Sequence, residues 1–387
     1  MISFVSGAVT AALAAAWYLN RPDGDTVSLV DQSGQLRDLL EQRQGSRAGA
    51  AGGASETSQT RVPTPQVRGS LDVETTRLIF AMPEHNFVHD PNTFYRYRPG
   101  LSQTQPWSQH PDGEWLLATN AVGLREDADQ MPAQRDLFVL VAGDSHVDGM
   151  CSNDESFVAL LEQRLSAKKP GEVVEALNTG TSGYNIYNYL GVLDKYLSEQ
   201  PDVFVVTIYG GNDYLGILQP HHYFQQSAPP PERSGYWEKI REAQKASSAA
   251  VGMALNQAYY FQHYPEEVDF ARDAALALTE EIQSICAAND IDLVWVYIPP
   301  VYDVEEERAR EMERAREILD LSDYDMSVAD RLTDAMLEKA REKGQPIVDL
   351  RAEFAKESGP FYWRDGHINL TAHALIARLL EPLIARP

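Results

Sequence analysis

The sequence predicts an α/β protein whose parallel sheet is covered by helices on both faces. From residue 136 onward, short apolar runs rich in β-branched residues alternate with amphipathic stretches of ten or more residues. Polar, often glycine-containing segments follow several of the apolar runs. Strands that alternate with helices of this length form βαβ units, and such units build parallel sheets.

Five apolar runs are short enough to be buried strands, bounded by turn residues. These expected strands are residues 136–143, 173–180, 201–213, 292–300 and 346–350. The expected helices between and after them are 155–165, 186–200, 268–289, 327–344 and 370–384. Residues 214–265 contain several prolines, and we expect an irregular segment there.

Composition fits a folded domain with a sizeable core, because 43% of the 387 residues are hydrophobic and 23% are charged. The formal net charge of −24 disfavours binding to nucleic acid or to anionic lipid. No Cys/His cluster has the spacing of zinc ligands, so we expect no metal site. Cys151 and Cys286 are expected to be free thiols, with a disulfide as the alternative.

The N-terminal region divides into three expected parts before the main domain. Residues 1–20 carry no charged side chain, which is typical of a membrane anchor or a signal segment. A buried terminal helix is the alternative. Residues 21–70 include a small, polar, aperiodic stretch and are predicted to be a flexible linker. Residues 71–134 are expected to be a small lead-in region of short strands and loops, followed by the main domain over 135–387.

Candidate functional residues follow the first three expected strands. In open parallel sheets such residues gather at the carboxyl ends of the strands. Ser145 lies between the first strand and a helix, and a serine there can act as a nucleophile if a base removes its proton. The alternative is that Asp144 and Ser145 only form a turn and a helix cap.

Two further polar segments could stabilise an oxyanion. In the segment 178–185, the backbone N–H of Gly183 is a candidate donor, because glycine allows a ligand close to the backbone. The side-chain amide of Asn212 is a second candidate, and Asp213 could hold its loop. Alone, each is equally consistent with an ordinary turn.

A general base is expected just before the last helix. His367 is the candidate base and Asp365 its orienting partner, which is the arrangement that a serine nucleophile needs. His373 is the alternative base. The alternative for His367 and Asp365 is a surface histidine and a turn carboxylate.

Taken together, these four segments resemble the SGNH (GDSL-like) hydrolase superfamily. Residues 142–146 (AGDSH) match its first block, and residues 119–127 (TNAVGLRED) resemble a lead-in found in bacterial members. The resemblance implies a three-layer α/β/α, flavodoxin-like domain with about five parallel strands. It also implies catalysis by Ser145, Asp365 and His367, with an oxyanion hole formed by Ser145, Gly183 and Asn212.

This sequence departs from the usual family pattern at two places. Asp365 and His367 are separated by one residue instead of two, a form similar to relatives involved in polysaccharide O-acetylation. His146 stands where an apolar residue is more usual. We expect that Asp144, His146, Tyr184 and Asp213 surround the substrate, with capping or core packing as the alternative for each.

The sequence therefore predicts a serine-dependent ester hydrolase that needs no cofactor. Its expected substrate is a small acyl ester or an acylated carbohydrate. An O-acyltransferase acting on an extracellular polysaccharide and a non-catalytic binding module of the same fold are the alternatives. The resemblance implies a bacterial protein, and residues 1–20 favour one that is membrane-anchored, or secreted to the periplasm or the exterior.

Overall fold

The structure is a computed structural model that describes residues 35–40, 69–80, 85–129 and 131–385. The predicted segment 1–20 and most of the predicted linker lie outside the described residues. In the part of that region that is described, residues 35–40 are helical and bury Leu36 and Leu40. No described helix is both long and apolar enough to cross a bilayer.

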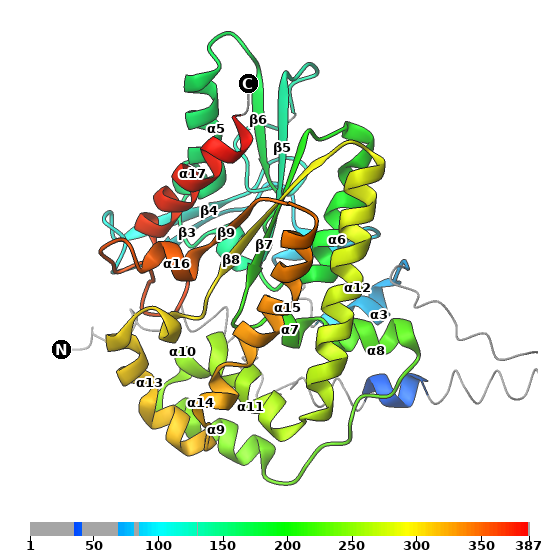
Figure 1. Ribbon diagram of the computed structural model, residues 1–387, viewed down its shortest axis with the longest axis vertical. Coiled ribbons are helices and arrows are strands. Elements are labelled where there is room, and N and C mark those ends of the chain that lie inside the picture. Colours follow the sequence, from blue (N-terminus) through cyan, green and yellow to red (C-terminus); the bar gives the residue numbers. More distant parts are fainter. Residues whose placement is uncertain (1–34, 41–68, 81–84, 130, 386–387) are drawn as a thin grey trace, which may run out of the picture.

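A five-stranded parallel sheet forms the centre of the molecule (Figure 1). Its strands, in the spatial order β6-β5-β7-β8-β9, are Val174–Asn178, Leu137–Ala142, Val203–Tyr209, Asp292–Ile298 and Ile347–Asp349. All neighbouring pairs are parallel. This order is the flavodoxin-like one, and it confirms the predicted fold class. Its switch point falls between β5 and β7, where ligands of such sheets bind.

Helices cover both faces of the sheet and complete the three layers (Figure 1). On one face lie α5 (Phe157–Lys168), α16 (Leu350–Phe354) and α17 (Leu370–Ile384). On the other face lie α6 (Ile186–Tyr196), α12 (Glu266–Ala288) and α15 (Val328–Glu342). β5 and β7 are buried along their whole length, as expected for strands covered on both sides.

The segment 214–265, which we expected to be irregular, is largely helical, so that prediction is wrong. Pro220 is the third residue of its helix, where no N–H partner is needed, and Tyr236, Ile240 and Ala243 form a buried helical face. The elements of this insert are α7 (Asp213–Gly216), α8 (Leu218–Gln225), α9 (Tyr236–Ala246), α10 (Ser248–Ala250), the π-helix η3 (Val251–Leu255) and α11 (Asn256–His263).

Further helices stand beyond the carboxyl ends of the central strands, beside the insert (Figure 1). Helix α13 (Glu306–Leu319) packs on α9, and its exposed side carries several i,i+3 ion pairs. Other short helices of the main domain are α14 (Asp323–Met326), η1 (Asn153–Glu155), η2 (Leu197–Glu199) and η4 (Val301–Asp303).

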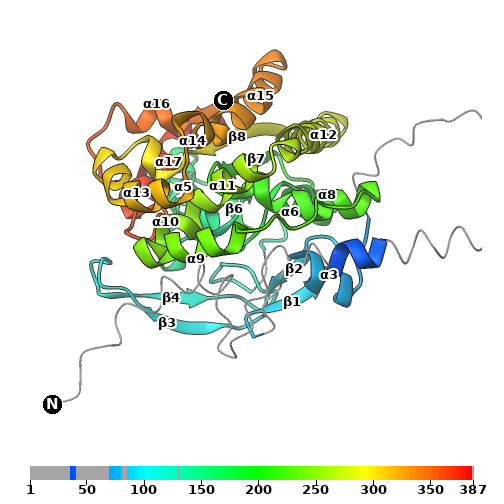
Figure 2. The same ribbon diagram turned by 90° about the horizontal axis from the view of Figure 1, so that it is seen from below.

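The lead-in region forms a layer of its own along one side of the main domain (Figure 2). It consists of helix α3 (Val73–Phe80), which we did not predict, and two antiparallel hairpins. The hairpins pair β1 (Phe87–Asp90) with β2 (Phe94–Tyr97) and β3 (Ser102–Pro106) with β4 (Glu114–Ala118). Aromatic side chains of β1 and β2 pack inward and tie this layer to the rest of the fold.

Candidate active site

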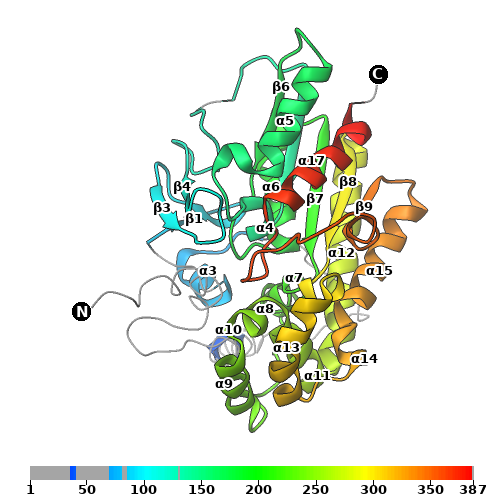
Figure 3. The ribbon, with the colours of Figure 1, turned by 90° about the vertical axis from the view of Figure 1, so that its left-hand side faces the viewer.

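Ser145 lies at the carboxyl end of β5, as the first residue of the short helix α4 (Ser145–Asp148). Gly143 makes this tight turn sterically feasible, because a Cβ there would lie 2.1 Å from a methyl carbon of Val147. Figure 3 shows α4 between the lead-in hairpins and the central sheet. Ser145 is 6% exposed, so the residue is buried and does not stand on an open surface.

Ser145, His367 and Asp365 form a continuous chain of hydrogen bonds. His367 Nδ1 lies 2.7 Å from Asp365 Oδ2, and His367 Nε2 lies 2.9 Å from Ser145 Oγ. Because the carboxylate accepts a hydrogen bond from Nδ1–H, Nε2 is left as an acceptor for the serine hydroxyl. The structure thus brings together the three residues that the sequence predicts as a triad, in the geometry for proton transfer from a serine.

The short spacing between Asp365 and His367 is accommodated by a tight turn. Tyr362 and Ile368 form an antiparallel bridge, and Gly366 between the two site residues has a φ of +98°. This left-handed conformation favours glycine. It lets the Asp365 carboxylate bond both the backbone N–H of His367, at 3.2 Å, and the imidazole. The departure from the usual spacing therefore keeps the contact between carboxylate and imidazole.

The environment of His367 favours its protonated form. Burial alone would lower its pKa, but the charge and hydrogen bond of Asp365 outweigh burial, and Asp144 and Asp148 add to the effect. The net result is a pKa raised above the ordinary histidine value of 6.5. A base with a raised pKa takes a proton more readily, which suits it to accept the proton of Ser145 during an attack.

Three candidate donors to an oxyanion lie on the loops that follow β5, β6 and β7, which are neighbours in the sheet. Within the described residues, the backbone N–H groups of Ser145 and Gly183 donate to no protein acceptor. Gly183 is exposed, and its φ is +79°. Asn212 is the N-cap residue of α7, its side chain makes no cap hydrogen bond, and it is partly exposed after the end of β7. These groups lie on the three loops that the sequence predicts for an oxyanion hole.

The two aspartates predicted near the substrate serve the protein backbone instead. Asp144 Oδ1 accepts the N–H of His146 and caps α4. Asp213 accepts the N–H of Tyr209 and the hydroxyl of Tyr189. Burial raises the pKa of Asp144 to about 6 and that of Asp213 well above the ordinary value. Their placement fits the alternative that we gave for both, namely loop and helix capping.

His146 and Tyr184 are also buried, so neither side chain offers an exposed contact to a substrate. The ring of His146 lies 3.9 Å from that of Tyr209 and 5.1 Å from that of His367. Its Nδ1 accepts the N–H of Ile368 at 3.4 Å. The Tyr184 hydroxyl donates to the carbonyl oxygen of Tyr95. For these two residues the structure favours core packing over the predicted substrate contact.

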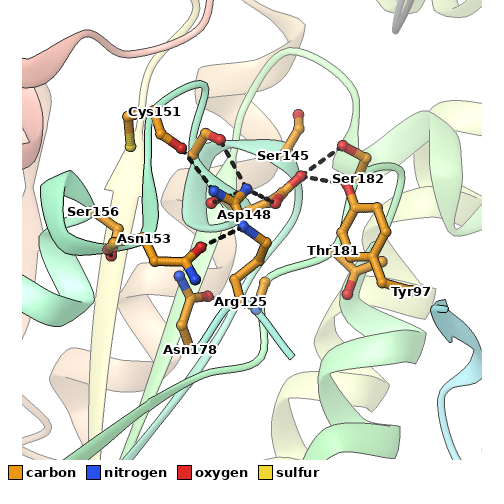
Figure 4. A network of polar contacts seen from close by, with 12 residues as sticks. Tyr97, Arg125, Ser145, Asp148, Cys151, Asn153, Ser156, Asn178, Thr181 and Ser182 are labelled. Carbon is orange, nitrogen blue, oxygen red and sulfur yellow. Dashed lines mark hydrogen bonds and ion pairs between the residues drawn. The ribbon is translucent and has the colours of Figure 1, made fainter. Parts of the chain in front are cut away.

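A buried polar network that we did not predict lies beside the nucleophile (Figure 4). Arg125 Nη1 lies 2.6 Å from Asp148 Oδ1, and both side chains are almost completely buried. The other oxygen of Asp148 accepts the hydroxyls of Tyr97 and Ser182. Arg125 was inside the quoted lead-in motif, but its partners lie 23 or more residues away, so no local pattern identified them.

The alternative base and the thiols take no part in this site. His373 lies in α17, where Nδ1 accepts the N–H of Phe157 and Nε2 is 3.8 Å from the sulfur of Cys151. Cys151 and Cys286 are both free and buried.

In the described residues, His110, Asp112 and Glu155 are close enough to hold a metal ion. His110 already pairs with Glu155 there.

Comparison with protein families identifies the group to which this fold and site belong. The chain belongs to the GDSL-like lipase/acylhydrolase (SGNH) family, whose model matches residues 141–375. The matched range contains Ser145, Gly183, Asn212, Asp365 and His367. No curated protein matches the chain.

Several solved structures are similar to this chain at low identity. An α/β hydrolase enzyme from the metagenome of Lake Arreo, Spain, is 17% identical, with a TM-score of 0.39; the match covers 65% of this chain and 98% of that one. The lipase/acylhydrolase from Enterococcus faecalis is 17% identical, with a TM-score of 0.35 and coverages of 64% and 96%. An acetyl xylan esterase from Geobacillus stearothermophilus is 16% identical, with a TM-score of 0.34 and coverages of 65% and 95%.

Proposed function

We propose that the protein is a serine-dependent ester hydrolase of the carboxylesterase or acetylesterase type. The observation that carries this proposal is the unbroken chain of hydrogen bonds from Asp365 through His367 to Ser145. A serine hydroxyl is a weak nucleophile unless an oriented base accepts its proton, and this chain supplies such a base.

In the proposed reaction, Ser145 Oγ attacks the carbonyl carbon of an acyl ester while His367 Nε2 accepts the hydroxyl proton. The carbonyl oxygen becomes an oxyanion, which accepts hydrogen bonds from the N–H groups of Ser145 and Gly183 and from the Asn212 amide. His367 then donates the proton to the leaving alcohol, and an acyl-enzyme remains. Water, deprotonated by His367, attacks the acyl-enzyme and releases the acid. Each of these steps uses only protein groups and water.

Transfer of the acyl group to a sugar hydroxyl is the second candidate function. It rests on the spacing of Asp365 and His367, which resembles that of relatives linked to polysaccharide O-acetylation. The chemistry to the acyl-enzyme is the same, and only the acceptor in the second half differs. We therefore propose a small acyl ester or an acylated carbohydrate as the substrate class, with residues 1–20 as an anchor or export signal. A non-catalytic binding module would keep this fold without turnover.

The proposed function is tested by measuring hydrolysis of p-nitrophenyl acetate and of longer acyl esters by the full chain and by Ser145→Ala. We expect turnover by the wild type and a loss of about a millionfold in kcat in the variant, down to the background of the assay. Ser284→Ala is the matched control, because Ser284 is an exposed helical serine far from the site in sequence. Turnover that survives Ser145→Ala would contradict the proposal.

Hydrolase and transferase are separated by adding acceptors. A hydrolase releases acid at a rate that is independent of added oligosaccharide. A transferase produces an acylated oligosaccharide, visible by mass spectrometry, at the expense of the free acid. A folded wild-type protein that neither hydrolyses nor transfers any of these esters would favour the binding module.

A further inference from the structure

The proposed oxyanion hole requires the Gly183 N–H to point toward the oxyanion, so something must fix the direction of this N–H. This N–H belongs to the peptide group that links Ser182 and Gly183. A peptide group is planar and trans, so its carbonyl oxygen and its N–H point in opposite directions. Whatever fixes the carbonyl oxygen of Ser182 therefore also fixes the direction of the Gly183 N–H.

The early part of the same loop is held by contacts with the main domain. The N–H of Thr181 donates to the carbonyl of Gly143, and the side-chain amide of Asn178 donates to the carbonyl of Val147. Gly180 packs so closely on α4 that a Cβ there would lie 2.3 Å from the backbone nitrogen of Asp148. The N–H of Tyr184 donates to the carbonyl of Thr181 at 3.1 Å and closes a turn around the Ser182–Gly183 peptide. None of these bonds is made to the oxygen or the N–H of that peptide itself.

That peptide is held by a residue of the lead-in region. The hydroxyl of Tyr95, on β2, donates to the carbonyl oxygen of Ser182 at 3.1 Å. The Tyr95 ring is itself fixed, because it is 2% exposed and packs edge-on against Phe87 and Tyr184. Tyr184 in turn donates its hydroxyl to the Tyr95 carbonyl. A buried, packed tyrosine thus donates to the carbonyl at the centre of a glycine-containing turn.

Ser182 is held a second time through its side chain. Its hydroxyl donates to Asp148 Oδ2 at 2.9 Å, and the Tyr97 hydroxyl donates to the same oxygen at 2.6 Å (Figure 4). Asp148 is fixed by Arg125, which binds its other oxygen. Since Asp148 is the last residue of α4, which begins at Ser145, this contact ties the oxyanion loop to the nucleophile's own helix.

We infer that Tyr95 is a positioning residue for catalysis: its hydroxyl orients the Ser182–Gly183 peptide so that the Gly183 N–H faces the oxyanion. Asp148 supports this by holding the Ser182 hydroxyl. The lead-in region is then a structural part of the active site, although it lies outside the residues matched to the family. The inference rests on the proposed esterase function and extends it.

The space around Gly183 agrees with this role. A Cβ on Gly183 would lie 2.9 Å from the Tyr95 hydroxyl oxygen, and the φ of +79° disfavours any side chain. Glycine is thus needed for two reasons, the backbone conformation and the approach of the tyrosine hydroxyl. Both are explained if the loop is shaped around the donor from Tyr95.

Tyr95→Phe tests the inference, because it removes the hydroxyl and keeps the packed ring. Complete removal of one oxyanion donor costs about 10²–10³ in kcat in other hydrolases. Because Tyr95→Phe misorients a donor without deleting it, we expect kcat to fall by about 10- to 100-fold, with KM within about twofold. Tyr187→Phe is the matched control: it removes an equally buried hydroxyl, bonded to His221, and we expect it to leave kcat unchanged.

A second readout separates positioning from general damage. A trifluoromethyl ketone forms a tetrahedral adduct with the serine and places an oxyanion in the hole. Its affinity should fall in Tyr95→Phe by the same factor as kcat/KM, while the affinity of a carboxylate product stays unchanged. A variant that loses thermal stability and both affinities together would overturn the inference, as would an unchanged kcat.

Failure of the inference and failure of the proposed function give different results. An inactive, folded wild type contradicts the function. An active wild type with an equally active Tyr95→Phe contradicts the positioning role alone. Crystal structures of the wild type and of Tyr95→Phe test the positioning role without an activity assay. We expect one orientation of the Ser182–Gly183 peptide in the wild type and a different or mixed orientation in the variant. The same orientation in both structures would overturn the inference.

Discussion

The two loops that flank Ser145 are held in place in contrasting ways. In the loop from Tyr362 to Ile368 the contact between Asp365 and His367 is local, and a backbone bridge closes the turn. Glu305 and Gln109 also accept backbone N–H groups around this turn. The last peptide of the loop from Gly180 to Gly183 depends instead on Tyr95, 87 residues earlier than Ser182. The comparison teaches that the partner that orients the base lies beside it in the sequence, while the residue that bonds the oxyanion loop's last peptide lies far away in the sequence.

The largest effect should come from the loop that carries Asp365 and His367. We expect Asp365→Asn to lower kcat by about 10⁴-fold, because the amide would favour the wrong imidazole tautomer. In the wild type, kcat/KM should fall as the pH drops through a midpoint above 6.5, since the pKa of His367 is raised and only the neutral ring can act as a base.

The pH profile of Asp365→Asn tests whether Asp365 raises the pKa of His367. Without the Asp365 charge, burial should dominate the environment of His367, so the acid midpoint should move to lower pH. The profile of kcat/KM between pH 4 and 9 measures this shift. An unchanged midpoint in Asp365→Asn would mean that another carboxylate sets the pKa of the base.

A large loss of stability is expected when the buried ion pair between Arg125 and Asp148 is broken. Arg125→Met would leave the buried Asp148 carboxylate without its cation, and breaking a buried ion pair typically costs about 3–5 kcal/mol. Urea denaturation of both proteins measures this difference. Arg314→Met is the control, because Arg314 pairs with Glu317 at an exposed site, where the cost should stay below about 1 kcal/mol. Equal losses in the two variants would contradict the assigned importance of the network.

Removing a donor directly should cost less than removing the orientation of the base. We expect Asn212→Ala to lower kcat by about 10²–10³-fold, with little change in KM, since the amide would act on the transition state alone. Steady-state kinetics test this, with Asn289→Ala as a matched control at an exposed helix end. A rise in KM at constant kcat would assign Asn212 to substrate binding instead.

The smallest effect is expected at His146. Its Nδ1 makes one long hydrogen bond, and its Nε2 has no partner among the described residues. His146→Leu introduces the apolar residue that is usual in the family. We expect kcat to change by less than about tenfold, because the loops 362–368 and 180–183 keep their shorter hydrogen bonds. The same ester assay measures it. A loss as large as that of Asp365→Asn would give His146 a direct role in catalysis.

The sequence was most informative where strands alternate with helices and where site residues are close together in the chain. All five strands of the sheet were predicted, because buried parallel strands are continuous apolar runs. Asp365 and His367 were recognisable as a pair since only Gly366 separates them. Ser145 and Asn212 were recognisable because they follow β5 and β7, which are neighbours at the switch point of the sheet.

The sequence was least informative where tertiary contacts decide the structure. The insert 214–265 was predicted to be irregular because of its prolines. Its helices are stabilised by burying one face against the rest of the fold, as α9 does. Asp213 and Tyr184 follow site residues directly, yet their side chains turn into the core and bond Tyr189 and the Tyr95 carbonyl. The role of Tyr95 depends on a contact across 87 residues, for which no local pattern exists.

The most direct test of this account is to trap the acyl-enzyme and find the residue that carries it. The full-length protein would be mixed with p-nitrophenyl acetate, quenched in acid within milliseconds, digested and analysed by mass spectrometry. We predict one acetyl group on the peptide that contains Ser145, which is absent in Ser145→Ala and accumulates more slowly in Tyr95→Phe. Acetylation at another residue, or turnover without an acetyl adduct on Ser145, would contradict the assignment of Ser145 as the nucleophile.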